Sequence, residues 1–279
     1  MKIMKQLSKI VVLISLLIQS TFLLADIYRS EDSKGNVSFS DQPSANAKII
    51  EPAVQTYRYK HQVKKVYDGD TITLANGDRV RLLGINTPEI ENHQRQGEAG
   101  GQIAKKWLQD KLQQGQVYLE YDHEKQDKYD RLLANLFLPD GEHINKVMLE
   151  SGLATLSIIP PNVRYAAEFQ QAQLLAEQQG LGLWAMPEYQ PRPVATLSKE
   201  NNSGWQRFLA TPQSIKQGRT YVRLVLTEKV DIRIPKANLD LFPELTEYLN
   251  KPLEIRGWAS RSKDTFSILV RHPSAIIYQ

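Results

Sequence analysis

Cysteine is absent from the 279-residue chain. Its absence excludes a disulfide framework, a thiolate metal site, a cysteine nucleophile and the lipid-modified cysteine of a lipoprotein. A chain of this length can bury a core without disulfide bonds, so an oxidising compartment is still permitted. Histidine is scarce: the five histidines show no spacing typical of metal ligands. The sequence also contains no glycine-rich loop of the phosphate-cradling type.

The first 25 residues have the pattern of a secretory signal peptide. Three lysines precede a mostly apolar run over residues 10–24, and Ala25 stands before the polar Asp26. We expect cleavage after Ala25 and a periplasmic or secreted, monomeric protein without stable membrane association. The alternative is an uncleaved membrane anchor, although the run is short for a bilayer span.

Turn residues and charge divide the remaining chain into modules. We predict a small β-hairpin module and linker over 26–55, a main domain over 56–186, a linker over 187–203 and a C-terminal domain over 204–279. Loss of the signal lowers the net charge from +4 to +1, yet residues 191–279 alone carry +6. This excess indicates either a footprint for a polyanion or an ordinary solvated surface.

The main domain has the pattern of a mainly β fold with helices, of the α+β class. Hairpin turns such as Asn76-Gly77 separate five strand-like runs, which favours a small closed β-barrel. The runs are Gln62–Val66, Thr71–Leu74, Val80–Ile85, Val117–Tyr121 and Leu133–Leu138. Apolar residues three or four apart predict three helices, near residues 99–108, 144–148 and 165–176, and Gly180 is a plausible stop for the last.

The C-terminal domain reads as strands, one helix, then strands. This order is compatible with a second small five-stranded barrel of the oligonucleotide-binding (OB) type. We predict strands over Thr220–Leu226, Val230–Ile234, Leu253–Trp258 and Phe266–Val270, and a helix over Leu239–Leu249.

Four short motifs in the main domain offer groups suited to phosphodiester hydrolysis. That chemistry needs a positioned water, a base and positive charge around the transferred phosphoryl group, and often a metal ion. The motifs are Asp68-Gly69-Asp70-Thr71, Arg81, Asn86-Thr87-Pro88-Glu89 and Asp127-Lys128-Tyr129-Asp130-Arg131. Taken singly, each has a structural explanation: a turn, a surface arginine, a helix entry and a core tyrosine. Their combination in this order is a strong signal.

Over residues 62–184 the chain resembles the staphylococcal nuclease family. The resemblance includes Tyr67-Asp68-Gly69-Asp70-Thr71, Arg81 to Glu89, Asp127 to Arg131, Ser151-Gly152-Leu153-Ala154 and Gly180-Leu181-Gly182-Leu183-Trp184. The family fold is a five-stranded OB-type barrel with three helices, in agreement with the strand and helix pattern above. The resemblance implies a calcium-dependent phosphodiesterase that cuts DNA and RNA and leaves 3′-phosphate ends.

The same resemblance implies a role for each site residue. Asp70, Asn86 and the carbonyl of Thr87 would bind calcium, and Asp68 would support them from the second layer. Glu89 would orient or deprotonate the attacking water, while Arg81 and Arg131 would clamp the scissile phosphate, for which planar guanidinium groups are suited. Lys128 and Tyr129 would contact the phosphate of the nucleotide.

Two departures from the family pattern affect these expectations. The family commonly has aspartate at the position of Asn86, and the loss of a charge predicts weaker calcium binding. Residues 157–162 lack the tyrosines that some members use to stack on a base, so no base preference is carried over. An alternative is therefore a catalytically weak nucleic-acid-binding or envelope-interaction protein on the same fold.

The C-terminal domain resembles an extension found on some bacterial members of the family. Its basic side chains could follow a nucleic-acid backbone: Arg219, Arg223, Arg256, Arg261, Lys263 and Arg271. Trp258 could stack on a base, although a core position beside solvated arginines is the preferred interpretation.

Overall fold

The computed structural model describes residues 27–31, 37–40, 48–50, 57–91 and 96–279. The chain divides into two compact units, Met1–Gln55 and Thr56–Gln279. The predicted signal peptide and its cleavage site lie outside the described residues. Among the helices that are described, none combines the length and the apolar character needed to span a bilayer.

The first unit contains a small antiparallel sheet. Its strands are β1 (Ile27–Glu31), β2 (Val37–Ser40) and β3 (Lys48–Ile50), in the order β2-β1-β3. Strands β1 and β2 form the predicted hairpin, with Tyr28 opposite Ser40. The third strand was not predicted, because its three residues are too few for an alternating pattern.

The second unit begins with a closed five-stranded barrel in the order β4-β5-β6-β9-β8. The strands are β4 (Arg58–Val66), β5 (Thr71–Leu74), β6 (Arg79–Leu82), β8 (Gln116–Gln126) and β9 (Leu132–Phe137). Alternate residues point inward, and Ile72, Val80 and Leu136 are completely buried. The predicted barrel is thereby confirmed.

One predicted strand is interrupted. The run Val80–Ile85 forms β6 and then β7 (Ile85–Asn86), which pairs with β10 (Thr155–Leu156) instead of continuing in the barrel. The break falls at Gly84, which has φ 73° and lies so close to Phe169 that an added Cβ would stand 2.5 Å from its ring. A glycine is required here both for the backbone conformation and for this close approach.

All three predicted helices are present. They are α2 (Gly101–Lys111), α3 (Ile144–Glu150) and α4 (Ala166–Gln178). Ala104 and Leu108 of α2, Met148 of α3 and Phe169 of α4 join the barrel residues in one hydrophobic core.

The C-terminal region folds into two further sheets around its own core. One sheet has the order β11-β12-β16-β19 and the other β13-β14-β15-β18-β17. The strands are β11 (Arg192–Pro193), β12 (Gln206–Ala210), β13 (Ser214–Gln217), β14 (Tyr221–Val225), β15 (Val230–Pro235), β16 (Leu253–Gly257), β17 (Ala259–Ser262), β18 (Thr265–Leu269) and β19 (Ile276–Tyr278). The four predicted strands correspond to β14, β15, β16 and β18. Within the described residues, the barrel of β4, β5, β6, β9 and β8 is the only closed one, and the two C-terminal sheets stay open.

The helix predicted over Leu239–Leu249 is wrong. The segment forms two 3₁₀ turns, η4 (Lys236–Leu241) and η5 (Leu245–Tyr248). Pro243 separates them: proline lacks the N–H that a helix needs and disfavours a helical conformation at the residue before it. Phe242, that residue, is extended with ψ 151°.

Residues 187–203, predicted as a linker, contribute to the C-terminal core. Val194 and Leu197 are buried in it, and Arg192 lies opposite Phe208 in a parallel β11–β12 pairing. The prolines and glycine that indicated a linker shape an ordered connection that includes η2 (Pro187–Tyr189) and η3 (Val194–Thr196). A further turn, η1 (Gly182–Ala185), joins it to α4, and η6 (Pro273–Ala275) precedes β19.

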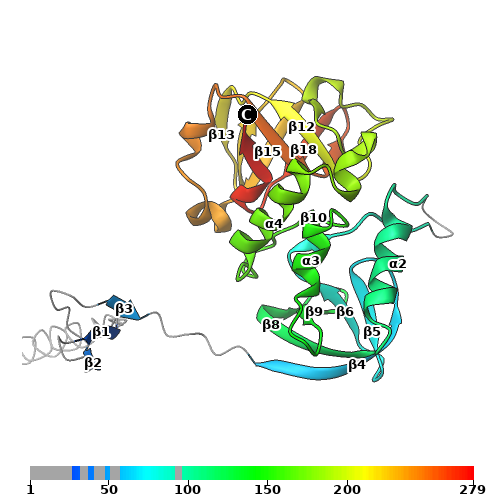
Figure 1. Ribbon diagram of the computed structural model, residues 1–279. Helices are drawn as coiled ribbons and strands as arrows, with labels where there is room; N and C mark the ends of the chain where they lie inside the picture. Colours follow the sequence, from blue (N-terminus) through cyan, green and yellow to red (C-terminus); the bar gives the residue numbers. More distant parts are fainter. Residues whose placement is uncertain (1–26, 32–36, 41–47, 51–56, 92–95) are drawn as a thin grey trace, which may run out of the picture. The chain divides into compact units, whose positions relative to one another are not determined.

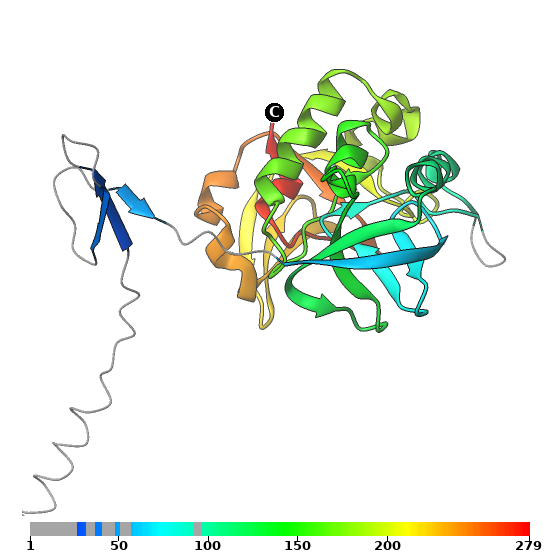
Figure 2. The ribbon, with the colours of Figure 1, turned by 60° about the horizontal axis from the view of Figure 1, so that its bottom comes forward.

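A buried charge network joins α4 to the C-terminal sheets, and α4 lies between them and the barrel (Figures 1 and 2). We call Glu177, Arg207, Glu254 and Arg256 the interface cluster. Arg256 donates to both oxygens of Glu177, at 2.5 and 2.7 Å, and its Nε donates to Glu254. Arg207 makes a bidentate contact with Glu254, at 2.7 and 2.8 Å. Two carboxylates and two guanidinium groups therefore neutralise one another in a largely buried interface.

Candidate active site

The barrel register gathers three of the four sequence motifs at one end. Thr71 lies opposite Arg81 on the neighbouring strand, and Arg81 lies opposite Leu133 on the next. Asp70 immediately precedes β5 and Arg131 immediately precedes β9. Thr71, Arg81 and Leu133 lie side by side on three neighbouring strands, and Asp70 and Arg131 are one and two residues away from this row along the chain.

The Asp68-Gly69-Asp70 turn packs tightly against the loop that follows β7. A Cβ added to Gly69 would stand 2.7 Å from the hydroxyl oxygen of Thr87 and 2.8 Å from the Cβ of Ala104. The glycine is thus needed for the close approach of the turn, the Thr87 loop and α2. The backbone N–H of Asp70 donates to Oδ1 of Asp68, which orients the first carboxylate inside the turn.

Asp70 is buried and connects two motifs. Its Oδ2 accepts a hydrogen bond from the backbone N–H of Thr87 at 2.8 Å and lies 3.0 Å from Nη1 of Arg81. Its Oδ1 accepts from the hydroxyl of Thr71 at 3.2 Å. The two predicted roles, calcium ligand and phosphate clamp, therefore fall on side chains in direct contact.

Asp68 is the titratable group most perturbed in this turn. Burial, together with the negative charge of Asp70, raises the pKa of Asp68 from 3.8 to about 6, although Arg81 acts in the opposite direction. The negative charges of Asp68 and Asp70 repel each other in this turn, and a bound cation would relieve that repulsion.

Asn86 stands between Arg81 and Thr87. Its Oδ1 accepts from Nη2 of Arg81 at 3.2 Å, and its Nδ2 donates to the carbonyl of Thr87 at 3.1 Å. A cation held by both of these oxygens requires the amide to turn its Nδ2 away from the Thr87 carbonyl. An aspartate at this position would have no such donor to move.

Glu89 is half-buried on the loop that leads toward α2. Its backbone N–H donates to a carboxylate oxygen of Glu98 at 3.0 Å, and its carbonyl accepts from the backbone N–H of Glu98 at 2.8 Å. An added Cβ on Gly101, the first residue of α2, would stand 2.6 Å from that carbonyl. Glu98 and Gly101 therefore fix the Glu89 loop, and the sequence motifs contained no signal for either residue.

Arg131 is held by its own hairpin loop. Its Nε donates to Oδ2 of Asp127 at 2.8 Å, and Oδ1 of Asp127 accepts from the backbone N–H groups of Tyr129 and Arg131. Burial disfavours the charged carboxylate, but these donors hold the pKa of Asp127 below its usual value. These contacts favour the charged form of Asp127, which orients the Arg131 guanidinium.

A cavity of about 310 Å³, here called the catalytic cavity, brings seven of the nine predicted site residues together. Its lining contains Asp68, Asp70, Arg81, Asn86, Thr87, Glu89 and Arg131, with Tyr67, Arg79 and Pro88 as further members. Lys128 and Tyr129 lie outside it, exposed on the adjoining wall of a neighbouring groove. The enzymatic interpretation required this convergence on one face of the barrel.

The donor set fits a hard cation such as calcium, which prefers oxygen ligands. The carboxylate of Asp70, the amide oxygen of Asn86 and the carbonyl of Thr87 all line the catalytic cavity. Across the described residues, no group of three or more histidine, cysteine, aspartate or glutamate side chains forms a conventional metal cluster. The set therefore has few formal charges, as expected where an asparagine replaces an aspartate.

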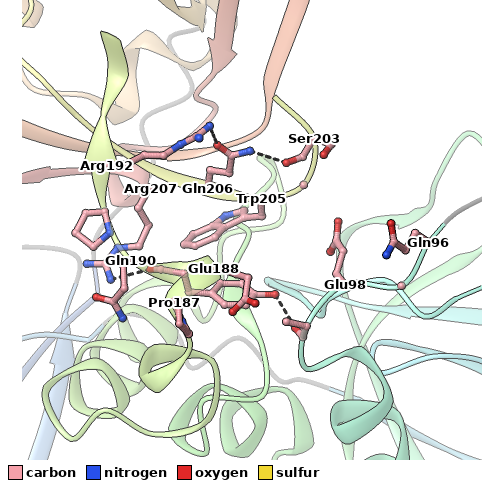
Figure 3. Close-up of a pocket in the computed structure, with 15 residues that line it drawn as sticks. Gln96, Glu98, Pro187, Glu188, Gln190, Arg192, Ser203, Trp205, Gln206 and Arg207 are labelled. Atoms are coloured by element: carbon pink, nitrogen blue, oxygen red, sulfur yellow. Dashed lines mark hydrogen bonds between the residues drawn. The ribbon is translucent and has the colours of Figure 1, made fainter. Parts of the chain in front are cut away.

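A second pocket, of about 660 Å³, lies between the loop before α2 and the segments around Tyr189 and Trp205 (Figure 3). Its polar groups bind one another: Arg192 donates to Asn201 and Gln206, and the hydroxyl of Tyr189 donates to the carbonyl of Ala99. None of the nine predicted site residues lines it. The predicted site residues that line the catalytic cavity are therefore separate from this pocket.

The C-terminal basic residues are divided by the structure. Arg256 belongs to the interface cluster and Arg223 pairs with Asp231, so neither follows a nucleic-acid backbone in this arrangement. Arg219, Arg261 and Lys263 are exposed. The preferred interpretation of Trp258 as a core residue is wrong, because its side chain is 41% exposed at a groove beside the catalytic cavity.

A known protein family matches the segment that contains Arg81, Glu89 and Arg131. The family described as "Staphylococcal nuclease homologue" matches residues 79–186, and a domain of unknown function, DUF4124, matches residues 14–58. The thermonuclease of Staphylococcus intermedius is 38% identical over 125 residues, which cover 44% of this chain and 74% of that protein. Endonuclease YncB of Bacillus subtilis is 31% identical over 171 residues, covering 57% and 81%. The thermonuclease of Staphylococcus hyicus is 30% identical over 146 residues, covering 51% and 83%. With its barrel, its catalytic cavity and these relatives, this chain belongs to the staphylococcal nuclease family.

Proposed function

We propose that the chain is a nuclease, a calcium-dependent phosphodiesterase that hydrolyses DNA and RNA to products with 3′-phosphate ends. The observation that carries the proposal is the placement of Asp70, Arg81, Glu89 and Arg131 around one cavity. Relatives named thermonuclease and endonuclease support the reaction class.

The residues of the cavity account for each movement of charge in the reaction. Glu89 accepts a proton from a water molecule, whose oxygen attacks phosphorus. The bond from phosphorus to the 5′ oxygen breaks, and this oxygen leaves with the electron pair and takes a proton from solvent water, so that the phosphate stays on the 3′ end. Arg81 and Arg131 donate hydrogen bonds to the phosphoryl oxygens, where negative charge increases in the transition state.

Arg81 must exchange one anion for another during the cycle. Its Nη1 lies 3.0 Å from the carboxylate of Asp70, so a phosphate competes with that carboxylate for the guanidinium. Asp70, Asn86 and the Thr87 carbonyl would hold the calcium ion. When bound, a calcium ion neutralises Asp70 and withdraws charge from a phosphate oxygen. Arg131 keeps Asp127 as a fixed partner and is already oriented.

A cleavage assay tests this proposal. We expect the protein to cut single-stranded DNA and RNA with calcium and not with a chelator, and Glu89→Gln to be about 10²–10⁴-fold slower. Glu168→Gln is the matched control, since Glu168 is exposed on α4 and lines neither the catalytic cavity nor the neighbouring groove. Products should resist 3′ extension until treated with a phosphatase. Equal rates for wild type and Glu89→Gln, or full activity in chelator, would contradict the proposal.

The hydrogen bonds of Asn86 favour a second candidate, a nucleic-acid-binding or envelope-interaction protein with little catalysis. They engage two of the oxygens that would bind calcium. This candidate predicts that Asn86→Asp creates cleavage that the natural protein lacks. Tight retention of DNA by the wild type, without cleavage under any metal condition, would favour it over the nuclease.

We also propose that the protein acts outside the cytoplasm as a monomer, after cleavage behind Ala25. The charge and hydropathy pattern of residues 1–25 supports this proposal. Cell fractionation and N-terminal sequencing of the exported form provide the test. A full-length protein that stays in the membrane fraction would instead support an uncleaved anchor.

A further inference from the structure

A groove of about 640 Å³ extends the catalytic cavity toward the C-terminal sheets. The two spaces share Arg81, Asn86 and Arg131 in their linings. We call this larger space the extended groove. Its side near the barrel includes Lys128, Tyr129 and Ile159, while Trp258 and Arg271 come from the C-terminal region. The groove is therefore built partly from sequence outside the matched family domain, which ends at residue 186.

Trp258 presents an indole to this groove. All five residues of β16 are buried, but Trp258, the next residue, is 41% exposed. Gly257 before it has φ 145°, a conformation that favours glycine and turns the chain out of the strand. Ile159 and Tyr129 of the same groove are also exposed, by 51% and 65%. Three exposed apolar or aromatic side chains thus line one channel.

Arg271 is a C-terminal arginine that is partly buried without a charged partner among the described residues. It is half-buried, and among the described residues its guanidinium has no hydrogen bond or ion pair, whereas Arg207, Arg223 and Arg256 each contact a carboxylate. Burial lowers the pKa of Arg271 from its usual value. An anion bound in the groove would compensate this charge.

The charge of the extended groove has the sign that a polyanion requires. Four cationic side chains line it, Arg81, Lys128, Arg131 and Arg271, against the two acids Glu124 and Asp127. Asp127 is already engaged by Arg131. A positively charged channel with exposed aromatic faces is the usual arrangement for binding single-stranded nucleic acid, because unpaired bases can stack and phosphates pair with the cations.

We propose that Trp258 and Arg271 form a nucleotide subsite that holds the substrate strand beyond the scissile phosphate. Trp258 stacks on an unpaired base, and Arg271 contacts a backbone phosphate. This inference rests on the proposed nuclease function and extends it: the C-terminal region selects single-stranded substrates long enough to reach the subsite. A duplex keeps its bases paired and offers Trp258 no free base face.

The test compares long and short substrates. For a single-stranded 12-mer, Trp258→Ala should raise KM by roughly 5–150-fold with little change in kcat, the range found for removal of one base-stacking aromatic. Cleavage of a dinucleotide and of a duplex should be unchanged. Trp258→Phe should keep most of the 12-mer preference. Arg271→Gln should lower the salt dependence of 12-mer binding by about one phosphate contact, a slope change of about 0.7.

Two controls separate this inference from the general proposal. Arg219→Gln removes an exposed charge from the same region and should leave the 12-mer preference intact. Binding of a fluorescent 12-mer, followed by anisotropy in chelator, reports on the subsite even if the wild type proves inactive. Equal affinity of wild type and Trp258→Ala would overturn the inference. So would equal losses on the 12-mer, the dinucleotide and the duplex, which would assign Trp258 to packing.

Discussion

The interface cluster and the catalytic cavity combine the same kinds of charged groups to opposite effect. In the interface cluster, Glu254 contacts both Arg207 and Arg256. Burial works against its charge, but the two guanidinium groups hold the pKa of Glu254 below its usual value. In the cavity, burial and the charge of Asp70 raise the pKa of Asp68 to about 6. The neighbours of Glu254 therefore stabilise its negative charge, whereas the surroundings of Asp68 disfavour its negative charge.

This difference separates a structural network from a site prepared for a ligand. Buried ion pairs that satisfy one another hold elements together and have no further capacity to bind. Carboxylates left with surplus charge make the folded protein less stable until a cation arrives, and perturbed groups of this kind concentrate at functional sites. The following predictions test the contrast, beginning with the largest effect.

Removal of one partner from the interface cluster should be severely destabilising. Arg256→Ala leaves Glu177 and Glu254 buried with fewer partners, and we expect a loss of about 3–5 kcal/mol in the free energy of unfolding. Urea denaturation at pH 7 provides the measurement. Arg261→Ala, a change at an exposed arginine, should cost no more than about 0.5 kcal/mol. A loss below about 1 kcal/mol for Arg256→Ala would break the contrast.

Substitution of an arginine in the catalytic cavity should affect catalysis more than stability. Arg81→Lys keeps the charge but loses the planar fork, so cleavage should slow about 10²–10³-fold. Arg79→Lys is the comparison on the same strand. The Arg79 guanidinium lies 5.0 Å from the centre of the Tyr67 ring, whereas the Arg81 guanidinium contacts Asp70. We expect less than a tenfold loss there. Similar losses in both variants would show that the guanidinium of Arg81 has no special role in cleavage.

The two regions should respond to pH in opposite directions. A lowered carboxylate pKa, as in Glu254, gives stability above about pH 4.5 that is lost on acidification. The raised pKa of Asp68 means that stability falls as pH rises from about 4 to about 6, because the folded state holds the proton longer.

Asp68→Asn isolates the contribution of the cavity to this pH dependence. In chelator at pH 7.5, the variant should be more stable than the wild type by roughly 1–3 kcal/mol, and the difference should shrink toward pH 4. Asp264→Asn, at a side chain that is 80% exposed, should show no such gain. A variant that is less stable than the wild type at pH 7.5 would contradict the account.

The smallest expected effect concerns Asn86. Asn86→Asp adds a charge to the cation ligands and removes the amide that donates to Thr87, so calcium affinity should rise by roughly 5–30-fold. Pairing of the new carboxylate with Arg81 reduces the gain. Calorimetric titration measures the affinity, with the exposed Asn76→Asp as control. Unchanged affinity would mean that Asn86 takes no part in binding the cation.

Sequence reasoning predicted most of the side chains that line the catalytic cavity and missed residues that position them. The barrel strands were predicted because alternating runs such as Thr71–Leu74 and turns such as Asn76-Gly77 are local signals. The site residues were predicted through a resemblance to a family, carried by short motifs in the sequence. Glu98 and Gly101 had no such signal, because their role depends on a contact between the Glu89 loop and α2 that exists only in the folded chain.

The C-terminal region was harder to predict for the same reason. Pro243 was a local signal that should have excluded the predicted helix. Arg256 and Arg271, by contrast, look alike in the sequence, and only tertiary packing buries the first among carboxylates and directs the second into a groove. The exposure of Trp258 depends likewise on the turn at Gly257.

Calcium titration of the wild type and Asp70→Asn, followed by calorimetry, tests the proposed cation site of the catalytic cavity most directly. Circular dichroism should first confirm that both proteins are folded, because Asp70 also accepts a hydrogen bond from Thr87. The account predicts one calcium ion per chain for the wild type and at least tenfold weaker binding for the variant, since the main charged ligand is lost. Equal affinities in the two proteins, or no calcium binding by the wild type, would contradict it.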